Sequence, residues 1–252
     1  MEDHRRPRGR LRIALAVGAS LLATGCSESR FSFPDPRSTQ GEAILSLWRG
    51  AFVAALVIGA FTAGLILWCL FRYRARDGAD TVPRQVDHNV PLEVVYTAVP
   101  LLIVAVLFGF TLNTQRTVEK RHDAPMMVEV TGFQWQWRFR YPAQQLEVSG
   151  GPVNDARDNV PTMVLPVGKP VRVVLTSRDV IHAFWVPQFL FKKDNVPGRT
   201  NEFDLTVTEP GEYVGRCAEF CGLEHDRMTF RVLAVSPDEF DAALAAVAGS
   251  SL

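Results

Sequence analysis

The chain has 252 residues, with 27 Lys or Arg and 27 Asp or Glu, so its formal net charge is zero. This balance excludes the basic excess that is typical of nucleic-acid-binding proteins, and we expect no nucleic-acid partner. Four cysteines are too few for a disulfide framework. Long apolar runs up to about residue 113, followed by a mixed sequence, predict membrane segments and then one domain of ordinary size.

The first part of the chain, residues 1–25, is typical of a secretory signal. It has an arginine-rich start and then an apolar stretch from Ile13 to Leu22, which is too short to span a bilayer. Small residues directly precede Cys26, as in a bacterial lipobox. We therefore expect Cys26 to be the lipid-modified N-terminus of the mature chain. Ordinary signal cleavage and an uncleaved leader are the alternatives.

Two apolar runs predict a transmembrane hairpin over residues 44–113. Gly50 to Phe71 and Val94 to Leu112 are each about long enough to cross a ~30 Å bilayer core at ~1.5 Å per residue. The arginine-rich linker at residues 72–91 should lie in the cytoplasm, which places the C-terminal domain outside a bacterial cell membrane. Glu93 opens the second span, where a carboxylate suits the helix dipole and is also a functional candidate.

Residues 125–236 show the pattern of a small β-sandwich or barrel. Phe133 to Tyr141 alternates between aromatic and polar residues, which predicts one half-buried strand with five aromatics on one face. Residues 237–252 predict a short C-terminal helix and tail. The fold class is therefore α+β, a membrane hairpin followed by a β-barrel. Further strands are expected at residues 126–130, 171–176, 203–208, 213–216 and 228–235.

Soft ligands gather in one short segment of the predicted domain. Cys217, Cys221, His225 and Met228 follow the spacing C-x3-C-x3-H-x2-M, and His182 supplies a second imidazole. Thiolate, imidazole and thioether donors suit copper and not magnesium or calcium. Two thiolates can bridge two metal ions, so we expect a binuclear copper site built for one-electron transfer.

Two other interpretations of these residues are open. Cys217 and Cys221 would form a disulfide if the domain is extracytoplasmic. A tetrahedral Cys2His2 zinc site is the second alternative, but zinc rarely recruits a thioether such as that of Met228. The carbonyl of Glu219, between the two cysteines, is expected to face the metals.

At this point the chain resembles subunit II of cytochrome c oxidase, in the haem–copper oxidase family. The resemblance runs from the first span to about Val235. Besides the hairpin and the cysteine loop, it rests on Pro-Leu-Glu at 91–93, Gly-x-Gln-Trp-x-Trp at 132–137, Asp-Val-Ile-His at 179–182 and Val-Pro-Gly-Arg at 196–199.

The resemblance implies a cupredoxin-like barrel that holds a binuclear copper centre called CuA. It implies that electrons enter through Trp135 and that Glu93 lies at the mouth of a proton path into subunit I. It also implies that the Glu219 carboxylate helps to hold a magnesium or manganese ion at the boundary with subunit I. The copper ligands would be His182, Cys217, the Glu219 carbonyl, Cys221, His225 and Met228.

The sequence departs from the family pattern near the expected donor surface. Phe133 replaces a common histidine, Gln136 replaces a tyrosine, and Arg140 stands where many members carry a glutamate that docks cytochrome c. Asp179 matches a docking aspartate. The segments at 189–194 and 219–225 resemble actinobacterial members, in which the donor is a cytochrome held in a complex with the quinol-oxidising enzyme.

The expected function is that of an electron-transfer subunit of an aerobic respiratory oxidase. It would accept single electrons from cytochrome c and pass them to haem in subunit I, where reduction of oxygen to water is coupled to proton translocation. Its partners would be subunit I, the other oxidase subunits and the donor cytochrome. A subunit of a nitric oxide or nitrous oxide reductase is one alternative, and a copper-binding protein of the cell envelope is another.

Overall fold

The computed structural model describes residues 34–74, 85–124, 126–150 and 160–250. The chain divides into two compact units, Met1–Asp35 and Pro36–Leu252, and the description below concerns the second. The expected signal segment and Cys26 lie outside the described residues.

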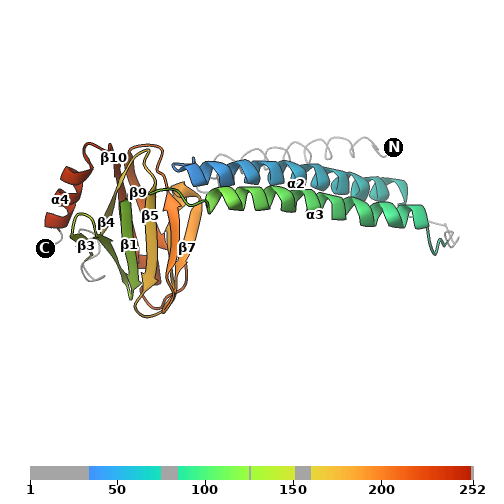
Figure 1. Ribbon diagram of the computed structural model, residues 1–252. Helices are drawn as coiled ribbons and strands as arrows, with labels where there is room; N and C mark the ends of the chain where they lie inside the picture. Colours follow the sequence, from blue (N-terminus) through green and yellow to red (C-terminus); the bar gives the residue numbers. More distant parts are fainter. Residues whose placement is uncertain (1–33, 75–84, 125, 151–159, 251–252) are drawn as a thin grey trace, which may run out of the picture. The chain divides into compact units, whose positions relative to one another are not determined.

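Two long apolar helices, α2 (Thr39–Arg72) and α3 (Val90–Val118), run side by side (Figure 1). Both are long and apolar enough to cross a membrane. Each begins several residues before its apolar run, because a polar cap sets the start of the helix. The Ser38 hydroxyl accepts a hydrogen bond from the N–H of Gly41, and the Asn89 side chain accepts one from Leu92.

The remainder of the second unit is built mainly from two five-stranded sheets, which confirms the predicted fold class. The first has the order β3-β2-β1-β5-β8 and the second the order β4-β10-β9-β6-β7. The strands of the first sheet are β1 (Met126–Phe133), β2 (Gln136–Tyr141), β3 (Leu146–Ser149), β5 (Val171–Ser177) and β8 (Asn201–Leu205). Those of the second are β4 (Thr162–Pro166), β6 (His182–Val186), β7 (Phe191–Asn195), β9 (Gly211–Cys217) and β10 (Thr229–Val235).

Aromatic side chains from both sheets form the core of this domain. Trp137 has no exposed surface, and its ring centroid lies 5.2 Å from that of Phe230 and 6.3 Å from that of Phe184. A terminal helix, α4 (Phe240–Ser250), is present where the sequence predicted one, beside β3 and β4 (Figure 1). It buries Phe240 and Leu244.

The prediction of one continuous strand from Phe133 to Tyr141 is wrong. Strand β1 ends at Phe133, a turn follows at Gln134 and Trp135, and β2 returns antiparallel to β1. Phe133 pairs with Gln136, and paired residues of antiparallel strands share a face. The ring of Phe133 therefore lies on the polar face, opposite to Trp137. It is near the guanidinium groups of Arg138 and Arg178, at 5.7 and 5.8 Å.

Four strands were not predicted, and their sequences explain why. β4 is a continuous apolar run without the alternation of a half-buried strand. β7 is an edge strand that carries Lys192, Lys193 and Asp194, and charges of this kind protect an edge from pairing with other chains. β3 and β6 are only four and five residues long.

The segment that follows α3 is held against the first sheet by charged groups. Asp204 on β8 is only 2 % exposed, and its carboxylate accepts hydrogen bonds from Arg172 at 2.9 Å and from the N–H of His122 at 2.6 Å. Arg172 also donates to the carbonyl of His122. Burial by itself raises the pKa of Asp204, but these two donors outweigh it and hold the pKa below its ordinary value.

We expect Asp204→Asn to lower the free energy of unfolding by roughly 1–3 kcal/mol at neutral pH. A carboxyl group whose pKa is lower in the folded state stabilises the fold at pH values above its unfolded-state pKa of about 3.9. This stabilisation is lost as the pH falls through the folded-state pKa. The difference between the two proteins should thus be complete at pH 7 and shrink below about pH 4. Thermal unfolding of the full chain in detergent at a series of pH values measures it, with exposed Asp238→Asn as the control. A difference that does not change with pH would contradict the assignment.

Candidate metal centre

Two paired strands and one loop bring the predicted ligands together. His182 begins β6 and Cys217 ends β9, and Phe184 pairs with Cys217 between these strands. The N–H of Cys217 donates to the carbonyl of Met228 at 2.9 Å, which closes the base of the loop that connects β9 to β10. The other ligand candidates lie on this closed loop, so they must turn back toward the two strand ends.

The donor atoms of all six predicted copper ligands form one cluster. The Cys217 sulfur lies 3.8 Å from the Cys221 sulfur, 3.8 Å from Nδ1 of His182 and 3.3 Å from the Glu219 carbonyl oxygen. The Cys221 sulfur lies 3.5 Å from Nδ1 of His225 and 3.8 Å from the Met228 sulfur. Each thiol thus has its own histidine beside it.

Cys217 and Cys221 are both free in this structure. Their sulfurs are far beyond the ~2.05 Å length of a disulfide bond. His182 and Met228 are buried together with them. The donor set of two thiols, two imidazoles and a thioether fits copper, and the buried thioether argues against zinc. The residues that are present therefore suit a copper centre.

The two thiols have opposite pKa shifts. Burial by itself raises the pKa of Cys217, but hydrogen bonds with His182, with the backbone of Glu219 and Ala183 and with Cys221 together outweigh it, and the pKa falls to about 7. Burial raises the pKa of Cys221, and the charge on the neighbouring Cys217 raises it further, to about 12. One thiolate is therefore formed readily, whereas the second is expected to lose its proton as a metal cation binds.

Asp179 fixes the orientation of the His182 ring. Its Oδ1 lies 2.8 Å from Nε2 of His182, and because a carboxylate only accepts, Nε2 must donate; in the neutral imidazole, the form that binds a metal, Nδ1 then has its lone pair toward Cys217. Burial by itself lowers the pKa of His182, and the bonds with Cys217 and Asp179 raise it above its ordinary value. Gly132 lies against the ring, because a Cβ there would be only 3.0 Å from Cδ2 of His182.

The turn between β1 and β2 contacts the cysteine loop directly. The indole N–H of Trp135 donates to the carbonyl of Cys221 at 3.1 Å, and the Gln134 side chain donates to the same oxygen at 2.8 Å. Gly222 has a φ of +121°, and a Cβ there would be 3.1 Å from the Trp135 nitrogen. A glycine is therefore required both by the backbone conformation and by the closeness of Trp135.

Comparisons with known proteins identify the family of the chain. Residues 126–235 match the family described as cytochrome c oxidase subunit II, periplasmic domain, and residues 26–113 match its transmembrane domain. A probable cytochrome c oxidase subunit 2 of Streptomyces coelicolor is 40 % identical over 94 % of this chain and 86 % of its own length. The chain belongs to the cytochrome c oxidase subunit II family. It is an electron-transfer subunit of an oxidoreductase complex, with α2 and α3 in the membrane and the β-domain on the extracytoplasmic side.

Two further relatives are more distant. The cytochrome c oxidase subunit 2 of Mycobacterium tuberculosis strain H37Rv is 32 % identical over 94 % of this chain and 82 % of its own length. The crystal structure of the periplasmic domain of subunit II of the Bradyrhizobium japonicum cytochrome oxidase is 33 % identical. It covers 52 % of this chain and 99 % of that domain, with a TM-score of 0.46.

Two predicted site residues carry carboxylates with expected roles beyond copper binding. Glu93 is in the first turn of α3, where its carboxylate accepts a hydrogen bond from the N–H of the cap residue Asn89 at 2.9 Å. The arrangement is similar to a capping box, with the glutamate one position later in the helix, and it gives Glu93 a structural role. The side chain of Glu219 is exposed, although its carbonyl faces Cys217.

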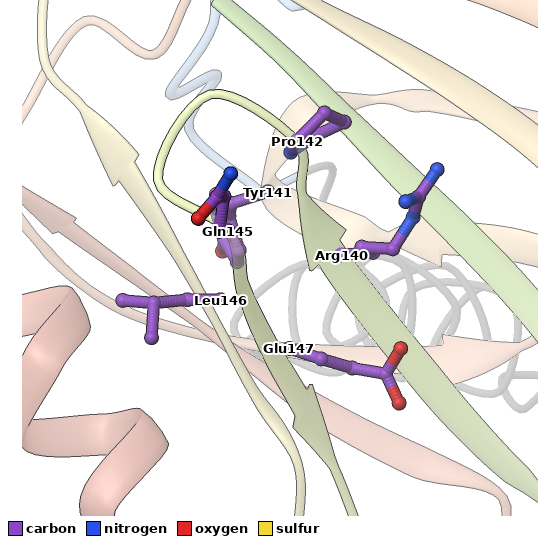
Figure 2. A pocket seen from close by; sticks show the side chains of 6 residues that line it. All are labelled: Arg140, Tyr141, Pro142, Gln145, Leu146 and Glu147. Carbon is purple, nitrogen blue, oxygen red and sulfur yellow. The ribbon is translucent and has the colours of Figure 1, made fainter.

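Arg140 lines a shallow hollow at the β2–β3 hairpin. Figure 2 shows Arg140 on β2 and Glu147 on β3 at this hollow. The two residues lie opposite each other in the register of these neighbouring strands. Arg140 donates two hydrogen bonds of 2.8 Å to the carboxylate of Glu129, and Glu147 pairs with Arg138 at 3.0 Å. The charged groups at this hollow are therefore already paired within the domain.

Besides the bond from Trp135 to Cys221, three contacts of the site were not predicted from the sequence. They are the Asp179–His182 hydrogen bond, the bond from Gln134 to Cys221, and a bond of 3.4 Å from the Trp137 indole to the Met228 carbonyl. The sequence held one usable signal, because Asp179 and His182 lie three residues apart in an irregular segment before a strand. The other two contacts join residues 87 and 91 positions apart.

Proposed function

We propose that this copper centre is binuclear and that the subunit is the electron acceptor of an aerobic respiratory oxidase. The observation that carries the proposal is the pair of neighbouring thiols, each with its own histidine, at 3.8 and 3.5 Å. Two copper ions held by Cys217, Cys221, His182, His225, Met228 and the Glu219 carbonyl would supply a one-electron redox centre.

The residues around the ligands are suited to such a role. Cys217, Cys221 and Met228 are no more than 7 % exposed and His182 is fully buried, so bulk water is kept away from these four side chains, whereas His225 is partly exposed. Asp179 holds the His182 ring, and the loop is closed by the bond from Cys217 to Met228. A rigid and dry set of ligands changes little when an electron arrives or leaves, which favours fast transfer.

Electron paramagnetic resonance of the copper-loaded full chain tests the proposal. We expect two copper ions per chain and the hyperfine pattern of one unpaired electron shared between two copper nuclei. A pattern from a single copper nucleus, at full copper loading, would contradict a binuclear site.

We further propose that electrons enter this subunit through Trp135. Its indole is half-buried, so one edge can reach a partner, and the other side is one hydrogen bond from the backbone of the ligand Cys221. From the copper centre the electron would be passed to haem in subunit I, where oxygen is reduced to water and protons are translocated.

Trp135→Phe should slow the oxidation of the donor cytochrome at least about tenfold, because it shortens the ring and removes the hydrogen bond to Cys221. The copper spectrum should change little, since no ligand is altered. Stopped-flow oxidation of the donor by the purified oxidase measures the rate. Trp185→Phe, at a second half-buried tryptophan, is the control, and equal rates in the two variants would count against Trp135.

We infer that the donor is not a freely diffusing basic cytochrome c. The carboxylate of Asp179 is occupied by Gln134, Val180 and His182, and that of Glu129 by Arg140, so neither is open to a basic partner. The hypothesis is a membrane-bound cytochrome within a supercomplex with the quinol–cytochrome c reductase. Fast oxidation of soluble basic cytochrome c with a steep salt dependence would contradict it.

The last proposals concern residues that act beyond the copper ligands. The exposed Glu219 carboxylate would help to hold magnesium or manganese at the boundary with subunit I, and Glu93 would open the proton path. Metal analysis of the purified oxidase with Glu219→Gln tests the first, and proton pumping with Glu93→Gln tests the second.

Cys26 is proposed as the lipid-modified N-terminus after removal of residues 1–25, which mass spectrometry of the mature chain tests. The domain limits proposed are 44–113 for the hairpin, 125–236 for the copper domain and 237–252 for the terminal helix and tail.

A further inference from the structure

We propose that Asn195 is a positioning residue for the ligand His182, and that it acts by joining the two sheets beside the imidazole. This inference rests on the proposed copper function of the site. Asn195 is the last residue of β7 and lies directly opposite His182 in the register of β6 and β7. It is fully buried.

The side-chain amide of Asn195 crosses from one sheet to the other. Its nitrogen donates to the carbonyl of Val130 on β1 at 3.1 Å and to the carbonyl of Thr176 on β5 at 2.9 Å. A carboxamide has two N–H donors, so both are used on these neighbouring strands. One residue of the second sheet thus holds two strands of the first.

The groups that contact the His182 ring lie on β1 and just beyond the end of β5. Two residues after Val130, Gly132 lies against the ring, where a Cβ would be 3.0 Å from Cδ2. Three residues after Thr176, Asp179 binds Nε2 at 2.8 Å. Asn195 therefore fixes the distance between His182 on its own sheet and both of its contacts on the other sheet.

The asparagine is not explained by packing alone. Among the described residues, its side-chain oxygen has no hydrogen-bond partner, and burying an unpaired amide oxygen is unfavourable. An apolar residue would avoid this penalty, but it could not bind the two carbonyls. The geometry of His182 supplies a reason for a polar residue at this buried position.

The experiment compares Asn195→Ala with Asn201→Ala in the full chain, purified in detergent and loaded with copper. Asn201 is a matched control, since its amide also joins the two sheets, from β8 to the carbonyl of Asp194 at 2.7 Å, but does not reach β1 or β5. Three quantities are measured: the copper hyperfine pattern, the reduction potential, and the rate of copper loss to a chelator. Thermal unfolding is recorded in parallel.

We expect Asn195→Ala to lose copper about tenfold faster, as when a group that orients a metal ligand is removed, with a changed hyperfine pattern and a shifted potential. Asn201→Ala should keep all three values even if it unfolds at a lower temperature. If Asn195→Ala does not fold, Asn195→Leu fills the same space without a donor and is measured instead. Wild-type values in a folded Asn195 variant would overturn the proposal. A single-copper spectrum from the unmodified chain would instead overturn the proposed function.

Discussion

Replacement of Cys221 by serine is expected to abolish the shared-electron copper signal and to lower donor oxidation by more than about 100-fold. Changes to groups that only orient metal ligands cost about 10–100-fold, so removal of a bridging ligand should cost more. The Cys221 sulfur lies within 3.8 Å of ligand atoms of Cys217, His225 and Met228, so its loss affects three of the other expected ligands. A serine oxygen is a harder donor and does not replace a thiolate for copper.

The copper content and spectrum of the purified full chain measure this effect. Cys217→Ser should behave in the same way, because the two thiols are proposed to share both metals. Cys69→Ser is the matched control, since Cys69 is an exposed residue of α2, within the predicted membrane span. If Cys221→Ser kept two copper ions and the wild-type signal, Cys221 would not be a ligand.

Replacement of Trp137 by alanine is expected to lower the free energy of unfolding by roughly 3–5 kcal/mol, the range for large aromatic side chains in a core. The ring has no exposed surface and is in edge contact with the rings of His182, Phe184 and Phe230. Its removal would leave a cavity between the two sheets. It would also remove the indole bond to the carbonyl of Met228, at the end of the copper loop.

Thermal unfolding of the full chain in detergent measures this change. Trp137→Phe keeps most of the ring and loses the hydrogen bond, so it should cost only about 1 kcal/mol. Trp135→Phe should have little effect on stability, although it should slow electron transfer. Similar unfolding temperatures for Trp137→Ala and Trp137→Phe would show that the ring does not support the core.

The aromatic segment shows where prediction from the sequence failed. The alternation from Phe133 to Tyr141 is real on both sides of the turn, but a two-residue turn reverses the chain. Side-chain periodicity does not reveal such a reversal when the turn contains no glycine or asparagine. The turn here consists of Gln134 and Trp135. The half-buried position of Trp135 beside Cys221 is a product of this turn, and a continuous strand would have placed it in the core.

By itself, the sequence determined the fold class and the two membrane helices, and it supplied the set of residues that we propose as copper ligands. These depend on local properties: the length of an apolar run, the alternation within strands, and the chemical softness of donors at fixed spacing in one loop. Only the tertiary structure decided that His182 meets that loop, that Asp179 turns inward to hold the His182 ring, and that Asn195 joins the two sheets beside it. These contacts depend on strand order and register, which are set by how two sheets pack around one core rather than by any single segment.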